Sequence, residues 1–150
     1  MTEVRFYHLL EQRLERVLPQ LLEISLQRGW RVVVQAASEE RVEAIDALLW
    51  TYREDSFLPH GTSRGPDAAD QPVLLTADEV NANNATVRFL IDGVALPSDA
   101  SQYHRLVLIF DGTDDELVAR AREQWTQAKA QGFEASYWQT DDGGRWVQKA

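Results

Sequence analysis

The chain has 150 residues, of which 44% are hydrophobic and 26% are charged, and its formal net charge is -9. These proportions are typical of one ordinary globular domain with a substantial core. Nucleic-acid-binding proteins usually carry a clustered basic face, so this acidic chain is not expected to contact nucleic acid directly. The absence of cysteine excludes disulfides, thiol nucleophiles and thiolate metal ligands.

No apolar run in the sequence approaches the roughly 20 residues that a helix needs to cross a bilayer. The first apolar run, within residues 1–12, contains charged residues and does not resemble the core of a signal peptide. We therefore expect a soluble cytoplasmic protein with no membrane partner.

The first helix is predicted from apolar residues that recur at helical spacing between Leu14 and Leu26, followed by Gly29 as a C-terminal cap. Pro19 is tolerated only near the start of a helix, which places the first turn around residues 12–15. This helix follows the first predicted strand and precedes the second.

Two further helices are marked by their caps. Ser38 is the expected N-cap of the second helix, which ends near residues 50–53. Thr113 and Glu116 form a capping box for the third helix, and Gly132 ends it.

Short apolar and β-branched runs predict the strands. The run LVLIF is wholly apolar and is therefore expected at the centre of the sheet. A turn at residues 142–144 is of the hairpin type and leads into residues 145–147, whereas the Gly-, Pro- and Ser-rich residues 56–70 predict a loop. The six predicted strands are residues 4–10, 30–36, 73–76, 86–91, 106–110 and 133–139.

The order of these elements predicts a single α/β domain over residues 1–150, with a Rossmann-like, mixed and mostly parallel sheet and helices on both faces. The turns that follow residues 4–10 and 106–110 contain neither GxGxxG nor GxxxxGK[ST]. The second of these turns holds Asp111, Asp114 and Asp115, which would repel a phosphate at the helix start. We therefore expect no nucleotide-binding loop and no cofactor.

Catalytic and metal-binding patterns are also missing. His8, His60 and His104 lie far apart, and none has a partner at metal-ligand spacing. Ser56 is close to His60 but is not part of a GxSxG elbow, so the favoured interpretation is that both side chains satisfy backbone groups of the loop. We expect no catalytic residue and no metal site.

One stripe of the third helix presents an aromatic residue between two cations, with Val118 beside them. These residues are Arg122, Trp125 and Lys129. In one interpretation, Trp125 covers the core while the long cationic side chains extend past it. In the other, the stripe forms a small pocket for a peptide with apolar residues and carboxylates, which Arg122 grips.

A second group of large apolar residues lies at the exit of the second helix and in the loop that follows: Trp50, Tyr52, Phe57 and Leu58. Leu49 is expected to belong to the core. The other four cannot all point inward from a helix end and a loop. They form either a satellite cluster on the domain's own core or a hydrophobic docking patch for another protein.

Several segments resemble the chi subunit family of bacterial DNA polymerase III, over nearly the whole chain. The most specific is ALLWTYREDSFLPHG at residues 47–61, and YWQTDDGGRW at residues 137–146 resembles the variant of the family found outside the enteric group. The others are FYHL, RGWRVVV, QPVLLT and ARAREQWTQAKAQGF, at residues 6–9, 28–34, 71–76 and 119–133.

The resemblance implies a mixed Rossmann-like sheet without a nucleotide site, and two protein-binding surfaces. It implies that the acidic C-terminal tail of single-stranded DNA-binding protein docks on the last helix, at Arg122 and Trp125 with Lys129 nearby. Where the family can carry a further lysine, this chain has Thr126. It also implies that Trp50 and Phe57 bind the psi subunit or another component of the clamp loader or helicase.

The expected function is therefore that of a non-catalytic tether. It would hold single-stranded DNA-binding protein by its tail and link it to the clamp-loader assembly during DNA replication, raising the local concentration of each partner. The alternative is a small-molecule or nucleotide-dependent enzyme on a Rossmann-like fold that uses the His60 loop.

Overall fold

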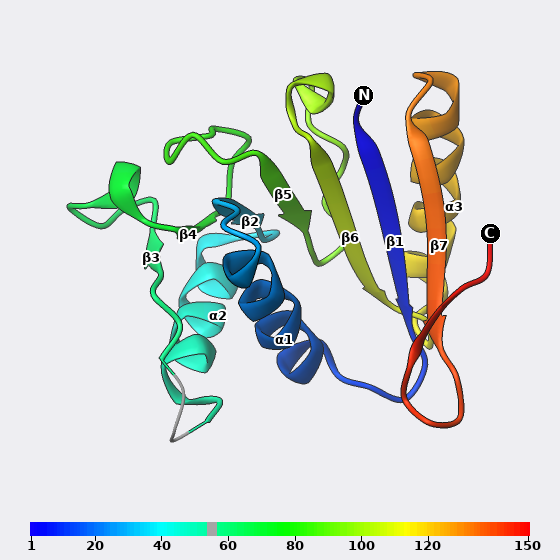
Figure 1. Ribbon diagram of the computed structural model, residues 1–150, viewed down its shortest axis with the longest axis horizontal. Helices are drawn as coiled ribbons and strands as arrows, with labels where there is room; N and C mark the ends of the chain where they lie inside the picture. The colour runs from blue at the N-terminus through cyan, green and yellow to red at the C-terminus, as the bar shows by residue number, and fades with distance from the viewer. Residues whose placement is uncertain (54–56) are drawn as a thin grey trace.

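The computed structural model describes residues 1–53 and 57–150 (Figure 1). Its helices are α1 (Leu14–Gln27), α2 (Glu39–Thr51) and α3 (Asp115–Ala130), and short 3-10 turns lie at Ala68–Asp70 and Ala100–Gln102. The strands are β1 (Glu3–Leu9), β2 (Val32–Gln35), β3 (Gly61–Thr62), β4 (Val73–Thr76), β5 (Val87–Leu90), β6 (Arg105–Asp111), β7 (Glu134–Thr140) and β8 (Trp146–Gln148).

The strands form one sheet in the order β3-β4-β2-β5-β6-β1-β7-β8. Every neighbouring pair is parallel except the last, in which β8 folds back on β7 as an antiparallel hairpin. The apolar strand β6 lies inside the sheet between β5 and β1, as predicted. The predicted α/β fold with a mixed, mostly parallel sheet is therefore confirmed.

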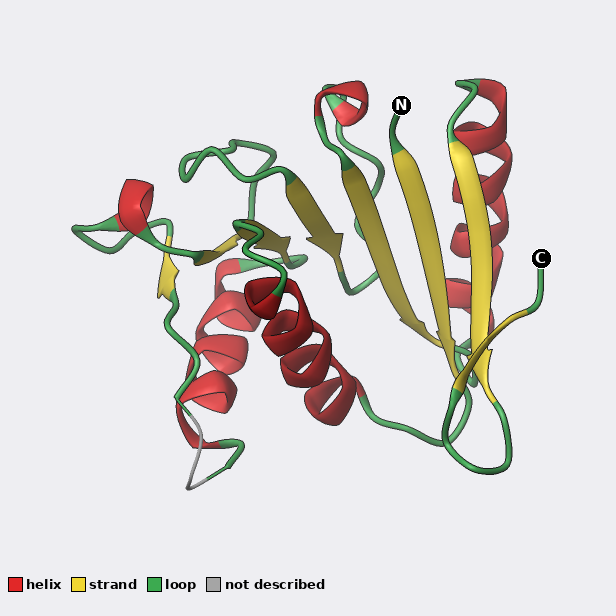
Figure 2. Ribbon diagram, in the orientation of Figure 1, coloured by secondary structure: helices red, strands yellow, loops and turns green. Residues whose placement is uncertain are grey.

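Helices cover both faces of the sheet, as Figure 2 shows. On one face, α1 and α2 bury Leu18, Leu22 and Ile45 in a core cluster that includes β2 and β4. On the other face, α3 buries Ala121 and Ala128 against β1 and β6. The α1 side of β1 and β7 is crossed by no helix of the described residues (Figure 1).

The helix ends show which local signals were correct. The Ser38 side chain accepts a hydrogen bond from the Arg41 N–H at 3.2 Å, so the predicted cap of α2 is confirmed. The predicted capping box of α3 is wrong, because Asp114 is the N-cap and accepts from the amides of Glu116 and Leu117 at 3.0 and 3.3 Å. A carboxylate is favoured at the positive end of a helix.

Residues 56–70, which were expected to be a loop, also contain β3 and a 3-10 turn. β3 has two residues, Gly61 and Thr62, and pairs with β4 at the edge of the sheet. A strand this short has no hydrophobic alternation, so the sequence carries no signal for it.

One charged side chain lies inside the sheet layer. Arg88 on β5 is fully buried, and its guanidinium donates hydrogen bonds to the Gln35 side chain, the Tyr103 hydroxyl and the carbonyls of Asp78 and Val80. Buried charges are tolerated when their donors are satisfied. This arginine therefore holds the polar segment between β4 and β5 against the sheet.

Candidate functional site

The first candidate site is centred on Trp125 of α3. The Trp125 ring is half-buried and packs edge-on against Phe6 of β1, at a centroid distance of 5.4 Å, and against Tyr137 of β7, at 6.1 Å. Aromatic pairs in this geometry stabilise a contact beyond the area that they bury. The packing fixes the position of the Trp125 ring relative to the sheet.

Two cations flank this ring from exposed positions on the same helix. The Lys129 Nζ lies 5.2 Å from the centre of the Trp125 ring, which is a cation–π distance. Arg122 is exposed one turn earlier. Burial raises the pKa of Tyr137, and the nearby positive charge of Arg122 partly offsets this rise. Within the described part of the chain, neither Arg122 nor Lys129 is paired with a carboxylate.

An open cavity of about 390 Å³ lies between α3 and β7. It is lined by Ala121, Arg122, Trp125, Thr126, Tyr137 and Ala150. The structure thus brings three of the predicted residues together, with Lys129 over the indole ring, whereas Val118 is partly buried and packs against the core cluster beneath α3. Tyr137 was not predicted, because β7 reaches this place only through the pairing of β7 with β1.

The chemistry available in this cavity is that of binding. Its floor is aromatic, and Arg122 at its rim can donate two parallel hydrogen bonds to a carboxylate. Thr126 supplies no charge, and its hydroxyl donates to the Arg122 carbonyl of the same helix at 3.2 Å. An apolar side chain next to a carboxylate is the ligand that matches these groups.

The second candidate site is an exposed aromatic pair at the end of α2. The Trp50 side chain is 53% exposed and that of Phe57 is 71% exposed. Their ring centroids are 5.8 Å apart, and the Trp50 ring also lies 4.6 Å from the ring of His60. Large aromatic side chains exposed together on a monomer are characteristic of an interaction site.

The other two residues predicted for this site are turned toward the core. Leu58 is 2% exposed and belongs to the core cluster under α2, so its side chain is not available on the surface. Tyr52 packs against the same cluster and donates a hydrogen bond from its hydroxyl to the Glu23 carboxylate of α1. Leu49 is buried, as predicted.

His60 is also an internal residue. Its Nδ1 lies 2.7 Å from the Leu58 carbonyl oxygen, and its Nε2 lies 3.0 Å from the Asp46 carboxylate. The interpretation that this histidine satisfies loop groups is therefore confirmed, while Ser56 lies outside the described residues. His104 is exposed, and His8 is partly buried within β1.

A crevice of about 440 Å³ lies at the C-terminal ends of β1 and β6, where doubly wound folds bind their ligands. His60 is not among its lining residues. Its walls carry four carboxylates, from Glu11, Glu15, Asp92 and Asp111, against two cations, Arg13 and Arg41, of which Arg41 is bound to Asp92 at 3.0 Å. The excess of carboxylates disfavours a phosphate ligand, and the crevice does not include the histidine loop that the enzyme alternative uses.

Among residues 1–53 and 57–150, no group of three or more metal-ligating side chains is arranged to hold a metal ion. No described helix is both long and apolar enough to span a membrane.

The fold and these two sites define a class: a small α/β protein with a Rossmann-like sheet and surface sites suited to binding. The model of the family described as DNA polymerase III chi subunit, HolC, matches residues 1–136. The chain belongs to this family of DNA replication proteins.

Two curated relatives support this assignment. The chain is 26% identical over 121 residues to a probable DNA polymerase III subunit chi of Rickettsia prowazekii, a match that covers 74% of this chain and 71% of the relative. It is 28% identical over 110 residues to the DNA polymerase III subunit chi of Haemophilus influenzae, covering 72% and 74%.

Proposed function

We propose that this chain is a cytoplasmic, non-catalytic tether of the DNA polymerase III assembly. The α3 cavity binds the acidic C-terminal tail of single-stranded DNA-binding protein. The Trp50–Phe57 pair binds the psi subunit or another component of the clamp loader or helicase.

The observation that carries the first half of this proposal is the set of groups around Trp125. A net charge of -9 repels an acidic peptide from most of the surface, so attraction must be local. Arg122 and Lys129 supply that attraction beside an aromatic floor, and both are exposed. An acidic tail that ends in an apolar residue satisfies both the charges and the floor.

The position of the second surface supports the tether mechanism. α3 and the end of α2 lie at opposite ends of the long axis of the molecule (Figure 1). The two surfaces therefore do not overlap. Two modest contacts then act as one strong link, because each raises the effective concentration of the other partner.

The tail site is tested by titrating the protein into a fluorescent peptide with several acidic residues and a terminal Phe. Replacing Arg122→Glu should weaken binding roughly tenfold or more, because it removes a bidentate partner and adds a repulsive charge. Arg120→Glu is the matched control, since Arg120 is exposed on the same helix but lies against Gly93 on the other side. Equal affinities of the parent and Arg122→Glu would refute the site.

The second surface is tested by capture of the clamp-loader components on the immobilised protein. Trp50→Ala and Phe57→Ala should each reduce capture while the peptide titration stays unchanged. Val80→Ala, which truncates another exposed apolar side chain away from the proposed sites, is the control. Capture that is unaffected by both aromatic substitutions would refute this half of the proposal.

A further inference from the structure

A further cavity, of about 170 Å³, lies on the face of the sheet opposite to α3, between α1 and β8. Its lining residues come from α1 and the turn after it, and from β1, β5, β6, β7 and β8. Three arginines line it, Arg5, Arg28 and Arg105, and so do three tryptophans, Trp30, Trp138 and Trp146. Neither of the sites described above uses any of these six residues.

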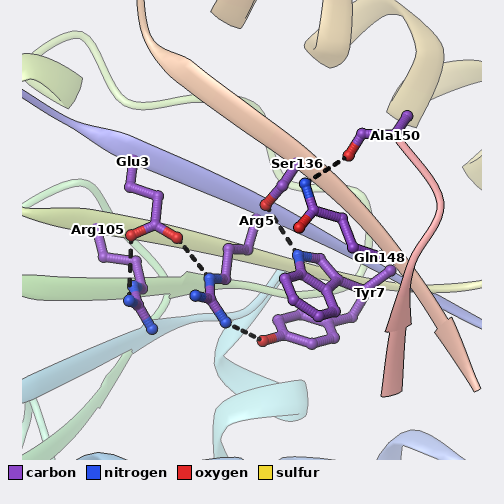
Figure 3. A network of polar contacts seen from close by, with 8 residues as sticks. Glu3, Arg5, Tyr7, Arg105, Ser136, Gln148 and Ala150 are labelled. Carbon is purple, nitrogen blue, oxygen red and sulfur yellow. Dashed lines mark hydrogen bonds and ion pairs between the residues drawn. The ribbon is translucent and has the colours of Figure 1, made fainter.

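The guanidinium groups in this cavity are only partly neutralised. Glu3 lies between Arg5 and Arg105 (Figure 3), with carboxylate–nitrogen distances of 2.5 and 3.1 Å. The Arg105 Nε is buried, and no described residue accepts a hydrogen bond from it. Arg28 has no ion-pair partner within the described part of the chain. The cavity thus holds three positively charged side chains, and the Glu3 carboxylate forms ion pairs with two of them.

Burial would lower the pKa of Arg5, but its hydrogen bonds to Glu3 and Tyr7 raise it, so Arg5 is compensated and Arg105 is not. Burial, together with the neighbouring Arg5 charge, lowers the pKa of Arg105. Burial alone would raise the pKa of Glu3, but its two arginine partners together lower it. Glu134 starts β7 on the same face, next to Glu3, but it is exposed to solvent. An anion would relieve the repulsion between the arginines.

The aromatic rings hold the guanidinium groups in place. The Trp30 ring has Arg28 and Arg105 at 4.9 and 4.7 Å from its centre, and Arg5 lies 4.9 Å from the centre of the Trp138 ring. Base stacking needs a free aromatic face. These rings are already contacted by cations, which favours a carboxylate ligand over a nucleic-acid strand.

We propose that this cavity is a second peptide-binding site, for an acidic segment of a partner protein that places carboxylates on Arg5, Arg28 and Arg105. The apolar rim suits an aliphatic side chain of the same segment, since Ile24 of α1 is 46% exposed there. The strong contrast between this local charge and the net charge of -9 selects an anionic ligand. The site is separate from the α3 cavity, because the sheet lies between them.

The test is a fluorescence anisotropy titration with the labelled peptide Asp-Glu-Leu-Glu-Asp, amidated at its C-terminus. Arg28→Gln should weaken binding roughly five- to tenfold, because it removes a charge-assisted contact from an exposed position where folding is not at risk. Arg16→Gln makes the same charge change on the same helix away from the cavity and should leave the affinity unchanged. Ile24→Glu should weaken binding by more than about threefold relative to Ile24→Gln, because it adds a competing carboxylate.

Three outcomes would overturn the proposal. The first is no binding of the peptide, or equal binding of its neutral counterpart Asn-Gln-Leu-Gln-Asn. The second is binding that Arg122→Glu abolishes and Arg28→Gln leaves unchanged, which would assign the peptide to the α3 cavity. The third is tighter, Arg28-dependent binding of a thymidine dodecamer, which would assign the site to single-stranded nucleic acid.

Discussion

Trp125 and Trp50 mark two surfaces that are built in different ways. Trp125 lies in the middle of α3, half-buried against Phe6 and Tyr137. Trp50 lies in the last turn of α2, is 53% exposed, and contacts Phe57 from the following segment. The Trp125 ring therefore packs on the core and also lines a cavity, whereas most of the Trp50 ring is exposed to solvent.

These two environments suit different modes of partner recognition. A ring held by the sheet is preorganised, so binding requires little ordering of the protein. A ring at a helix end offers a large apolar area that only a partner can cover. We therefore expect substitution of Trp125 to reduce the stability of the protein, and substitution of Trp50 to reduce partner binding with little effect on stability.

The largest expected effect separates the two tryptophans by stability. Trp125→Ala should lower the free energy of unfolding by about 3 kcal/mol, because it removes a ring that packs on two others. Trp50→Ala should lower it by less than about 1 kcal/mol, since most of that ring is already in water. Urea denaturation measures both, and equal losses would contradict the comparison.

A second prediction divides the α2 surface itself. Leu58→Ala should lower the free energy of unfolding by about 2 kcal/mol, because Leu58 is 2% exposed and its truncation leaves a cavity. Phe57→Ala should lower it by no more than about 0.5 kcal/mol, because that ring is 71% exposed. If Phe57→Ala lowers the free energy of unfolding as much as Leu58→Ala does, the Phe57 ring is packed on this domain and is not free for a partner.

A third prediction sharpens the α3 surface. Thr126→Lys should strengthen binding of the acidic, Phe-terminated peptide by roughly two- to fivefold, because it adds a cation at the cavity rim. Gln127→Lys adds the same charge on the other side of the helix, where Gln127 lines a separate depression. The gain should shrink in high salt, and an equal gain from Gln127→Lys would show that net charge alone is responsible.

The smallest expected effect is a pH dependence beneath the α3 surface. His8 forms a hydrogen bond with the Tyr137 hydroxyl, and burial lowers the pKa of His8 below its ordinary value of 6.5. Between the lowered pKa and 6.5 the unfolded chain binds more protons than the folded one, so stability falls as the pH decreases through that window. His8→Gln should reduce this fall.

Urea denaturation of the parent and His8→Gln at pH 7.5 and 5.5 measures the difference. His104→Gln is the matched control, because His104 is exposed. An equal decrease in the parent and in His8→Gln would contradict the assignment.

Much of the fold could be predicted because its signals are local. The run VLLT is β4 with the predicted bounds, and glycines with positive φ follow α1 and α3 at Gly29 and Gly132. The α3 stripe was also predictable, since a period of 3.6 residues places Arg122, Trp125 and Lys129 on one side of a helix. Each of these inferences depends on residues within a few turns of the chain.

The errors arose where a neighbouring or distant group decided the outcome. Asp114, rather than Thr113, caps α3, because the Thr113 hydroxyl and amide are both bound to the Asp111 carboxylate. Leu58 points into the core, although the composition of its loop allowed either direction. A loop has no periodicity that predicts which way a side chain faces.

The fold class, the helical stripe and the aromatic segment at the end of α2 all follow from patterns within short stretches of the sequence. Three features depend on contacts between remote segments: which aromatic side chains remain exposed, the place of Tyr137 in the α3 cavity, and the three arginines that line one cavity near Glu3. The physical reason is distance along the chain. Periodicity and caps act over a few residues, whereas Arg5, Arg28 and Arg105 meet because parallel pairing of β1 with β6, and the packing of α1, bring remote residues together.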